Sequence, residues 1–504
     1  MHINMSHYSI SIIISLFLSA GLLAETNSLG FFTNHSDIGN PKLAGSVDYD
    51  PATGKYIITG AGENIWAETD EFHYVYRKIE GDFIVRARMK LLGEGSHAHR
   101  KMGIMVRKDL THNSPHATTG LHGDGLTSLQ YRKEKGGITE EVKSPSEGPD
   151  VVQLERRGNT FIMSTANAGE TFKTVQLDSL DLGNSVYVGL YICSHKADVK
   201  EKAVAKNVRI VKPAPEGFTP YQDYIGSRIE VMDLETETRK IVHTSEKSLQ
   251  APNWTTDGEK LVYNSQGKMY TFDIDNKTIE ELNTGFATSN NNDHVLSFDG
   301  KMLGISHHSA KDNGNSIIYI LPSKGGEPKR ITPKGPSYLH GWSPDGEKLI
   351  YTGERDGKFD IYKIDIDTQE EVRLTDAPGL DDGSEYTPDG EYIYFNSVRT
   401  GTMQIWRMRP DGSEQEQITF DKYNDWFPHI SPDGKSLVFL SFREDIDPGD
   451  HPFYKHVYIG KMPIEGGKPK VIAYLYGGQG TINVPSWSPD SKKIAFISNS
   501  RMIE

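Results

Sequence analysis

The phrase SPDG at Ser343–Gly346 is one of six near-identical phrases in the second half of the chain. The others are TTDG (255–258), SFDG (297–300), TPDG (387–390), SPDG (431–434) and SPDS (488–491). Their last residues are separated by 42, 46, 44, 44 and 57 residues. A repeat of about 40–45 residues that contains several short strands is typical of a β-propeller. We therefore expect residues 225–504 to form a propeller.

Each phrase is expected to be the tight turn between the first two strands of a blade. Glycine accepts a positive φ there, and the aspartate side chain bonds the nearby backbone. The last unit ends soon after residues 493–498, whereas residues 228–234 and 239–242 match a third and a fourth strand ahead of the first phrase. Strands from the two ends of the propeller would then share one blade. The sequence thus predicts six blades, closed by the N-terminal strands, with no free sheet edge.

Three stretches of the repeat point to a known family. SPDGEKLIYTG (343–353), SPDGKSLVFLS (431–441) and SWSPDSKKIAFIS (486–498) resemble the propeller repeats of TolB, the periplasmic protein of the Tol–Pal system. The resemblance covers about residues 225–498. It implies a TolB-like six-bladed propeller and, for function, a protein-interaction scaffold with a protein partner in the cell envelope.

Residues 25–211 show the two-residue alternation of half-buried strands. In 83–89, Phe83, Val85, Ala87 and Met89 share one face, and arginines occupy the other. This pattern predicts an all-β domain, a two-sheet β-sandwich or jelly roll. Residues 212–224 hold three prolines and are expected to be a linker.

The strand patterns of this first domain resemble a second family. GDFIVRARM (81–89), KMGIMVRKD (101–109) and VYVGLYICS (186–194) are similar to strands of concanavalin A-like, laminin G-like sandwiches. Many such domains bind glycans, and others serve only as packing modules.

The ends and the composition of the chain limit its location and its partners. Residues 10–24 form an apolar run of 15 that is short for a membrane span, so residues 1–24 are predicted to be a signal peptide; an uncleaved anchor is the alternative. The expected location is the periplasm or the exterior, with no membrane span in the mature chain. A net charge of −14 argues against nucleic acid as a partner. The single cysteine, Cys193, is expected to be a buried core residue.

Histidines from three blades are candidate metal ligands. In a four-stranded blade, the connection into each first strand lies at the same mouth of the ring as the loop after the second strand. His294, His340 and His429 belong to three such connections. Imidazole can bind Mn, Zn or, with carboxylates, Ca, so we expect a divalent metal on the propeller axis. The alternative is that each histidine bonds a backbone carbonyl at a blade edge or is solvated.

Two carboxylates from neighbouring blades are the candidate catalytic residues. Asp382 and Asp425 are predicted to lie at the same mouth, where paired carboxylates act as general acid and base in glycoside cleavage. Capping of turns, or binding of a cation, is the alternative role for aspartates in such loops.

Further side chains at this mouth are candidates for binding a substrate. They are Glu385, Trp426, Arg355, Arg399 and Gln479. Residues 443–456 lengthen one unit and are expected to form a lid or partner loop, with Phe453 and Tyr454 able to stack on sugars. Trp426 could equally fill the gap between blades.

Three functions remain open at this level. The first is an exported protein that binds a glycan or oligosaccharide at the propeller mouth. The second is a metal-dependent lyase or hydrolase of oligosaccharides, since the repeat type and the histidines resemble those of oligogalacturonate lyases. The third is the envelope scaffold that the TolB resemblance implies.

Overall fold

The computed structural model describes residues 29–219 and 222–503, and these fold almost entirely into β-strands. The predicted signal peptide, residues 1–24, lies outside the described residues. One short 3₁₀-helix, η1 (Ala310–Asp312), is present. No helix in the described part of the chain has the length and apolar character needed to cross a membrane.

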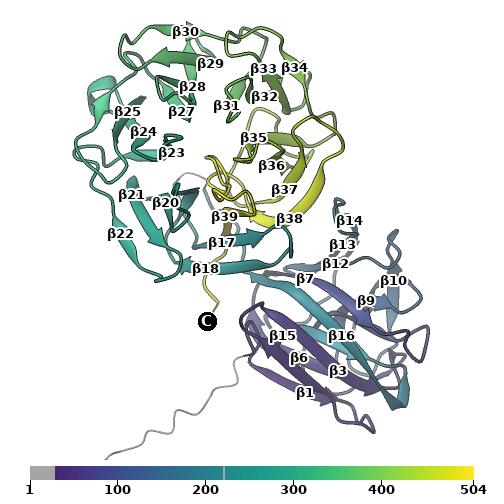
Figure 1. The fold of residues 1–504 in the computed structure, drawn as a ribbon. Helices are drawn as coiled ribbons and strands as arrows, with labels where there is room; N and C mark the ends of the chain where they lie inside the picture. Colours follow the sequence, from purple (N-terminus) through teal and green to yellow (C-terminus); the bar gives the residue numbers. More distant parts are fainter. Residues whose placement is uncertain (1–28, 220–221, 504) are drawn as a thin grey trace, which may run out of the picture.

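The second half of the chain is a closed ring of six blades (Figure 1). Five blades are four-stranded antiparallel sheets in simple chain order. Their strands are β19 (Gln250–Trp254), β20 (Lys260–Ser265), β21 (Lys268–Asp273) and β22 (Ile279–Glu281); β23 (Asn290–Leu296), β24 (Met302–His308), β25 (Ser316–Pro322) and β26 (Lys329–Arg330); β27 (Ser337–Trp342), β28 (Lys348–Arg355), β29 (Lys358–Asp365) and β30 (Glu371–Arg373); β31 (Asp381–Tyr386), β32 (Ile393–Ser397), β33 (Gln404–Met408) and β34 (Glu416–Gln417); β35 (Asn424–Ile430), β36 (Ser436–Phe442), β37 (Lys455–Pro463) and β38 (Lys470–Gly477).

The sixth blade joins the two ends of the propeller. β39 (Lys493–Asn499) pairs along its whole length with β17 (Ser227–Asp233), which pairs in turn with β18 (Arg239–Ser245). A bridge from Trp487 to Ile494 marks the inner edge of the same blade. The predicted six blades and their closure by N-terminal strands are therefore confirmed.

The repeated phrase makes the same turn in each blade. In the third repeat, Gly346 has a φ of 76°, and the amide of Lys348 donates to the Ser343 hydroxyl at 2.9 Å. The amide of Glu347 donates to the Asp345 carboxylate at 3.0 Å. Serine or threonine, aspartate and glycine recur because each supplies one part of this turn.

The first half of the chain forms two seven-stranded antiparallel sheets that share one apolar core. One sheet has the order β1 (Asn34–Ile38), β6 (Phe72–Glu80), β15 (Ser185–Cys193), β8 (Lys101–Arg107), β9 (His116–His122), β10 (Thr127–Arg132) and β11 (Glu140–Lys143). The other has the order β14 (Lys173–Leu177), β13 (Thr160–Ala166), β12 (Val151–Arg157), β7 (Phe83–Leu92), β16 (Lys196–Val211), β3 (Lys55–Gly62) and β2 (Ser46–Asp50); β4 (Ile65–Trp66) and β5 (Thr69–Asp70) form a small hairpin. The jelly-roll topology and the concanavalin A-like relationship stay predictions.

The two halves are packed against each other rather than merely tethered (Figure 1). Val151 and Ala166 of the first half share an apolar cluster with Tyr458 and Tyr474 of the fifth blade. The segment predicted to be a linker also docks, since the amide of Ala214 donates to the hydroxyl of Tyr476 in β38 at 3.1 Å. The first domain and the segment after it therefore pack against the outer strands of the fifth blade.

Candidate functional site

The innermost strands of five blades carry bulges near one mouth of the ring. Their register shifts fall in β19, β23, β27, β31 and β35. In β27 the pairing skips His340, and in β23 it skips residues 291–293. A bulged residue leaves the ladder, so its side chain can be aimed in a new direction. Here His340 and residues 291–293 line the central cavity.

The bulge in β31 requires a glycine. Gly383 has a φ of 64°, and a Cβ atom there would lie 2.3 Å from the side-chain oxygen of Asn396. Its amide donates to Oδ1 of the preceding Asp382 at 2.8 Å. The bulge thus both turns the strand and supplies a backbone donor to the carboxylate at the cavity wall.

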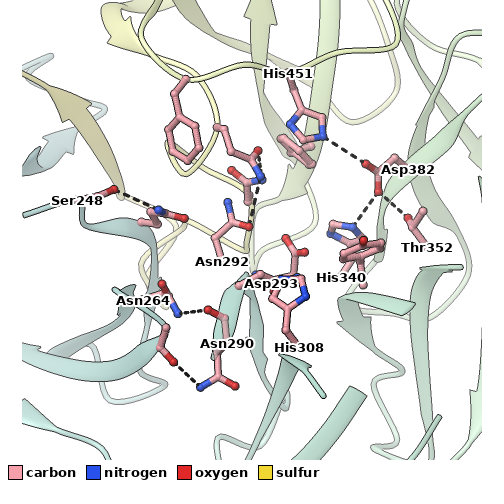
Figure 2. A pocket seen from close by; sticks show the side chains of 18 of the residues that line it. Ser248, Asn264, Asn290, Asn292, Asp293, His308, His340, Thr352, Asp382 and His451 are labelled. Atoms are coloured by element: carbon pink, nitrogen blue, oxygen red, sulfur yellow. Dashed lines mark hydrogen bonds and ion pairs between the residues drawn. The ribbon is translucent and has the colours of Figure 1, made fainter. Parts of the chain in front are cut away.

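A cavity of about 990 Å³ occupies this mouth (Figure 2). Its volume is at the upper end of the range usual for ligand pockets, roughly 300–1,000 Å³. Strands from the first five blades and two long connections contribute side chains to it. The lining includes Gln250, Asn264, Asn290, Asn291, Asn292, Asp293, His308, Tyr338, His340, Thr352, Phe359, Asp382, Phe427, His451, Phe453, Gln479 and Asn483.

Asp382 is the best-supported charged group of the cavity. Its Oδ1 atom accepts hydrogen bonds from the Thr352 hydroxyl at 2.6 Å and the Gly383 amide, and lies 2.9 Å from Nε2 of His340. Oδ2 accepts no hydrogen bond from the described residues and lies 4.0 Å from Nε2 of His451. Burial raises the pKa of this carboxyl, but His340, His451 and the Thr352 hydrogen bond outweigh burial and lower it to about 2. Asp382 is therefore ionised, with one oxygen free to accept from a ligand.

His340 and Asp293 complete the charged side of the cavity (Figure 2). Burial alone lowers the pKa of His340, yet the Asp382 carboxylate raises it above its ordinary value. Asp293 is only 7% exposed, and burial raises the pKa of its carboxyl to about 7, with His340 opposing the rise and Asp382 adding to it. Two carboxyls in one cavity thus differ widely in acidity, a pattern common in functional sites.

Amide side chains form the opposite side of the cavity. Asn483 donates to the Gln479 side-chain oxygen at 2.9 Å, and Gln479 donates to Asn292 at 3.4 Å. Asn264 donates to the backbone carbonyl of Asn290 at 3.1 Å. Nδ2 of Asn292 and Oδ1 of Asn290 are buried and have no partner in the described part of the chain. Both atoms are closed to solvent, so the groups that this wall offers to a ligand are its other amide atoms.

The predicted loop at 443–456 reaches over the cavity and contacts both the start of the propeller and the first domain. His451 and Phe453 line the cavity, whereas Tyr454 accepts a hydrogen bond from the amide of Ile225 at 3.2 Å. At the end of the loop, Nε2 of His456 lies 3.0 Å from the Glu155 carboxylate of the first domain. This contact connects the mouth of the propeller to the first domain.

The three predicted metal ligands do not meet, and that ligand set is wrong. His340 lines the cavity, but Nε2 of His294 lies 3.3 Å from the Val262 carbonyl. His429 has both ring nitrogens engaged, by Glu385 at 2.6 Å and by the Ile482 carbonyl. In the described residues, no three His, Cys, Asp or Glu side chains are arranged to hold a metal ion.

The predicted pair of Asp382 and Asp425 is also wrong. Asp425 does not line the cavity and accepts a hydrogen bond from the Ser441 hydroxyl at 2.6 Å, inside the fifth blade. Burial, together with Asp421, raises the pKa of its carboxyl well above the ordinary value. The second carboxyl of the cavity is instead Asp293.

Four of the five predicted binding residues have structural contacts away from the cavity, and these predictions are corrected. Glu385 binds His429 and the amide of Ile430; Trp426 is fully buried between blades; Arg355 pairs with Glu371 at 2.7 Å; and Arg399 pairs with Asp381 at 2.9 Å. Gln479 does line the cavity.

The amide-rich wall was missed, although the sequence carried a signal for it. Residues 290–293 read NNND, an uninterrupted polar run where a first strand should be half apolar. All four line the cavity. A polar run in place of the expected alternation therefore indicated that the start of β23 lines a cavity.

Comparison with known proteins shows which proteins the propeller half is similar to. Residues 334–448 match the family model of the TolB beta propeller domain. An uncharacterised protein of Agrobacterium fabrum is 47% identical over 272 residues, which are 54% of this chain and 92% of that protein. The solved structure of a TolB candidate from Agrobacterium tumefaciens is 45% identical, with a TM-score of 0.53, over 56% of this chain and all of that one.

A weaker similarity concerns an enzyme. Oligogalacturonate lyase of Dickeya dadantii is 32% identical over 82 residues, which are 16% of this chain and 20% of the lyase. The full-length match to the two Agrobacterium proteins carries the assignment: through its propeller half, the chain belongs to the TolB-like β-propeller family.

Proposed function

We propose that the protein binds a neutral oligosaccharide in the cavity at the propeller mouth. The observation that carries this proposal is the wall of amide side chains that line the cavity, among them Asn291, Asn292, Gln479 and Asn483. An amide both donates and accepts hydrogen bonds, and so does each hydroxyl of a sugar. A polyhydroxylated ligand can therefore satisfy this wall without bringing a charge into the cavity.

The charges around the cavity favour a neutral ligand over an acidic one. Asp382 is held ionised there, and Asp293 and Glu246 also line the cavity. Among the described lining residues, Lys247 is the only lysine or arginine, and it is exposed. A uronate carboxylate would lie near like charges with little compensation, which costs binding energy.

Aromatic rings supply the apolar contacts that a sugar ring needs. Tyr338, Phe359, Phe427 and Phe453 line the same cavity as the amides. Aromatic faces combined with a few placed polar groups are typical of small-molecule sites. The volume leaves room for an oligosaccharide rather than a single small sugar.

Two further parts of the proposal concern setting and partner. The apolar run at 10–24, outside the described residues, supports a periplasmic or secreted location. A protein partner of the cell envelope at the same mouth is the second candidate, which the TolB-like repeat supports. The similarity to oligogalacturonate lyase spans a fifth of that enzyme and supports only the repeat type.

Calorimetric titration of the full chain with neutral trisaccharides tests the binding. The panel is maltotriose, cellotriose, xylotriose, mannotriose and chitotriose, with trigalacturonate as the acidic comparison. We expect one or more neutral members to bind, and Asn292→Ala to weaken that binding about tenfold, since the wall loses an amide that lines the cavity and holds Gln479.

Asn276→Ala is the matched control, because Asn276 lies in the exposed turn between β21 and β22. It should leave the affinity unchanged. Binding of trigalacturonate in preference to every neutral member, or binding of no member at all, would contradict the proposal; the second result would favour the protein partner.

A further inference from the structure

Asp293 is a buried acid without a structural partner. Its backbone amide donates to Asn291, but its carboxyl forms no hydrogen bond or ion pair within residues 29–219 and 222–503. Asp425 and Asp381 are also buried, and each is held by a neighbouring hydroxyl or guanidinium group. Burying an unpartnered carboxyl costs stability, so its presence at a cavity wall points to a role toward the ligand.

Asp382 is the opposite case in the same cavity. Three donors hold its Oδ1 atom, and Oδ2 faces the cavity. The two carboxyls lie on β23 and β31, and the charge of each raises the pKa of His340 on β27. Figure 2 shows the contact between His340 and Asp382. Their environments keep Asp382 ionised and allow Asp293 to hold its proton near neutral pH, since the pKa of Asp293 is about 7 and that of Asp382 about 2.

Resting on the oligosaccharide binding proposed above, we infer that this mouth hydrolyses a glycosidic bond, with Asp293 as the proton donor and Asp382 as the carboxylate that stabilises positive charge at the anomeric carbon. A protonated and an ionised carboxyl facing one ligand are the pair that glycoside hydrolysis uses. His340 is a positioning residue, because it contacts Oδ1 of Asp382 and not Oδ2, the oxygen that would face the sugar.

The reaction balances with water as the only co-reactant. The bond between the anomeric carbon and the glycosidic oxygen breaks, and the Asp293 proton passes to that oxygen, which leaves as a hydroxyl. The positive charge that develops on the sugar ring lies against Oδ2 of Asp382. Water then forms a bond from its oxygen to the anomeric carbon and gives a proton to the Asp293 carboxylate, restoring the starting state.

The same charges argue for hydrolysis instead of elimination. Elimination of an acidic sugar needs cationic groups to neutralise its carboxylate and a base to remove a carbon-bound proton. Lys247, which is exposed, is the one lysine or arginine of the described lining. Of the two inner carboxyls, Asp293 holds its proton up to a pKa of about 7, and Asp382, with a pKa of about 2, is too weak a base to remove a carbon-bound proton. A neutral glycoside needs no such neutralisation.

Chromatographic detection of cleaved products from the neutral trisaccharide panel tests the inference on the full chain. We expect a member that binds to be cleaved, and Asp293→Asn to lower kcat by about 10²–10⁴-fold while the dissociation constant stays within a few fold. The rate for the parent protein should fall as pH rises above about 7. The other titratable groups that line the cavity are His340, Asp382, His308, His451, Tyr338, Tyr224, Glu246 and Lys247.

An aryl glycoside of the same sugar distinguishes proton donation from a structural effect. A nitrophenolate leaves without a proton, so Asp293→Asn should retain most activity on the nitrophenyl glycoside and little on the trisaccharide. Asp367→Asn, an exposed turn residue of the third blade, is the control and should match the parent protein.

Each outcome has one meaning. Loss of trisaccharide cleavage with retained binding and retained aryl-glycoside cleavage supports the inference. Binding without cleavage of any bound member, or equal losses on both substrates, overturns it and leaves the binding function standing. Absence of binding across the panel contradicts the proposed function itself and removes this inference with it.

Discussion

Glu230→Gln is expected to lower the free energy of unfolding by about 3–5 kcal/mol, as is usual when one member of a buried ionic group is removed. Glu230 in β17 is fully buried and lies 2.6 Å from Arg209 of the first domain and 3.0 Å from Arg239 of β18. The Ser498 hydroxyl of β39 also donates to it at 2.6 Å. One carboxylate therefore links strands β17, β18 and β39 of the closing blade and ties them to Arg209 of the first domain. A glutamine at this position would leave two buried guanidinium groups without a counter-charge.

The pH dependence of this contribution has a defined sign. Burial raises the pKa of Glu230, but Arg209 and Arg239 outweigh burial and hold it well below the ordinary value. A carboxyl with a lowered folded-state pKa adds stability above its unfolded pKa of about 4.3 and loses it as pH falls toward the folded value. The difference between the parent protein and Glu230→Gln should thus be full at pH 7 and shrink below about pH 4.

Urea unfolding followed by tryptophan fluorescence measures this difference. Glu281→Gln is the control, because the Glu281 pair with Lys268, at 2.8 Å, is solvent-exposed and should contribute far less to stability. Equal shifts for the two variants would show that Glu230 does not hold the domain junction together.

Asp293→Asn is expected to stabilise the protein at pH 8 by up to about 4 kcal/mol, and to change its stability little near pH 4. A raised folded-state pKa, about 7 against about 3.9 in the unfolded chain, means that the folded state binds more protons between these values. Stability contributed by the neutral acid is therefore present below about pH 4 and lost as pH rises through 7. Asparagine stays neutral, so it avoids that loss.

Thermal unfolding of both proteins from pH 4 to pH 8 tests this expectation. Taking the difference between the variant and the parent protein removes contributions that other groups make equally to both. A difference in stability that is constant over this range would mean that the pKa of Asp293 is not raised in the folded protein. Stabilisation by a substitution that removes a proposed proton donor is the trade-off expected at a functional site.

The fold was predictable because its signals are local and repeated. The phrase at 343–346 needs a hydroxyl, an aspartate and a glycine wherever it occurs, so the period is readable without knowledge of packing. The closure was predictable because the unmatched strands at 228–234 and 493–498 complete one blade by count. Both inferences depend on chain order alone.

The direction of individual side chains was not predictable in the same way. His340 lies three residues before Ser343, whereas His429 lies two before Ser431, and in a strand one residue of offset reverses the face. Bulges then shift the register at different points in different blades. His340 consequently faces the cavity, and His429 turns toward Glu385 and the neighbouring connection.

Burial explains the remaining errors. Trp426 is as compatible with stacking on a sugar as with filling a core, and its position inside the fifth blade depends on packing that involves His451 and Phe427. Arg399 was a candidate ligand group, yet it pairs with Asp381 and stacks on Trp406 at 4.7 Å. Such partners come from outside the local repeat pattern and appear only in three dimensions.

A crystal structure of the full chain with the tightest-binding neutral trisaccharide tests the central claim most directly. The account predicts a sugar in the 990 Å³ cavity, with hydroxyl groups hydrogen-bonded to the amide wall at Gln479 and Asn483 and to Oδ2 of Asp382, and with Asp293 facing a glycosidic oxygen. A trisaccharide bound on the first domain, with the mouth of the propeller free of sugar at saturating concentration, would contradict it.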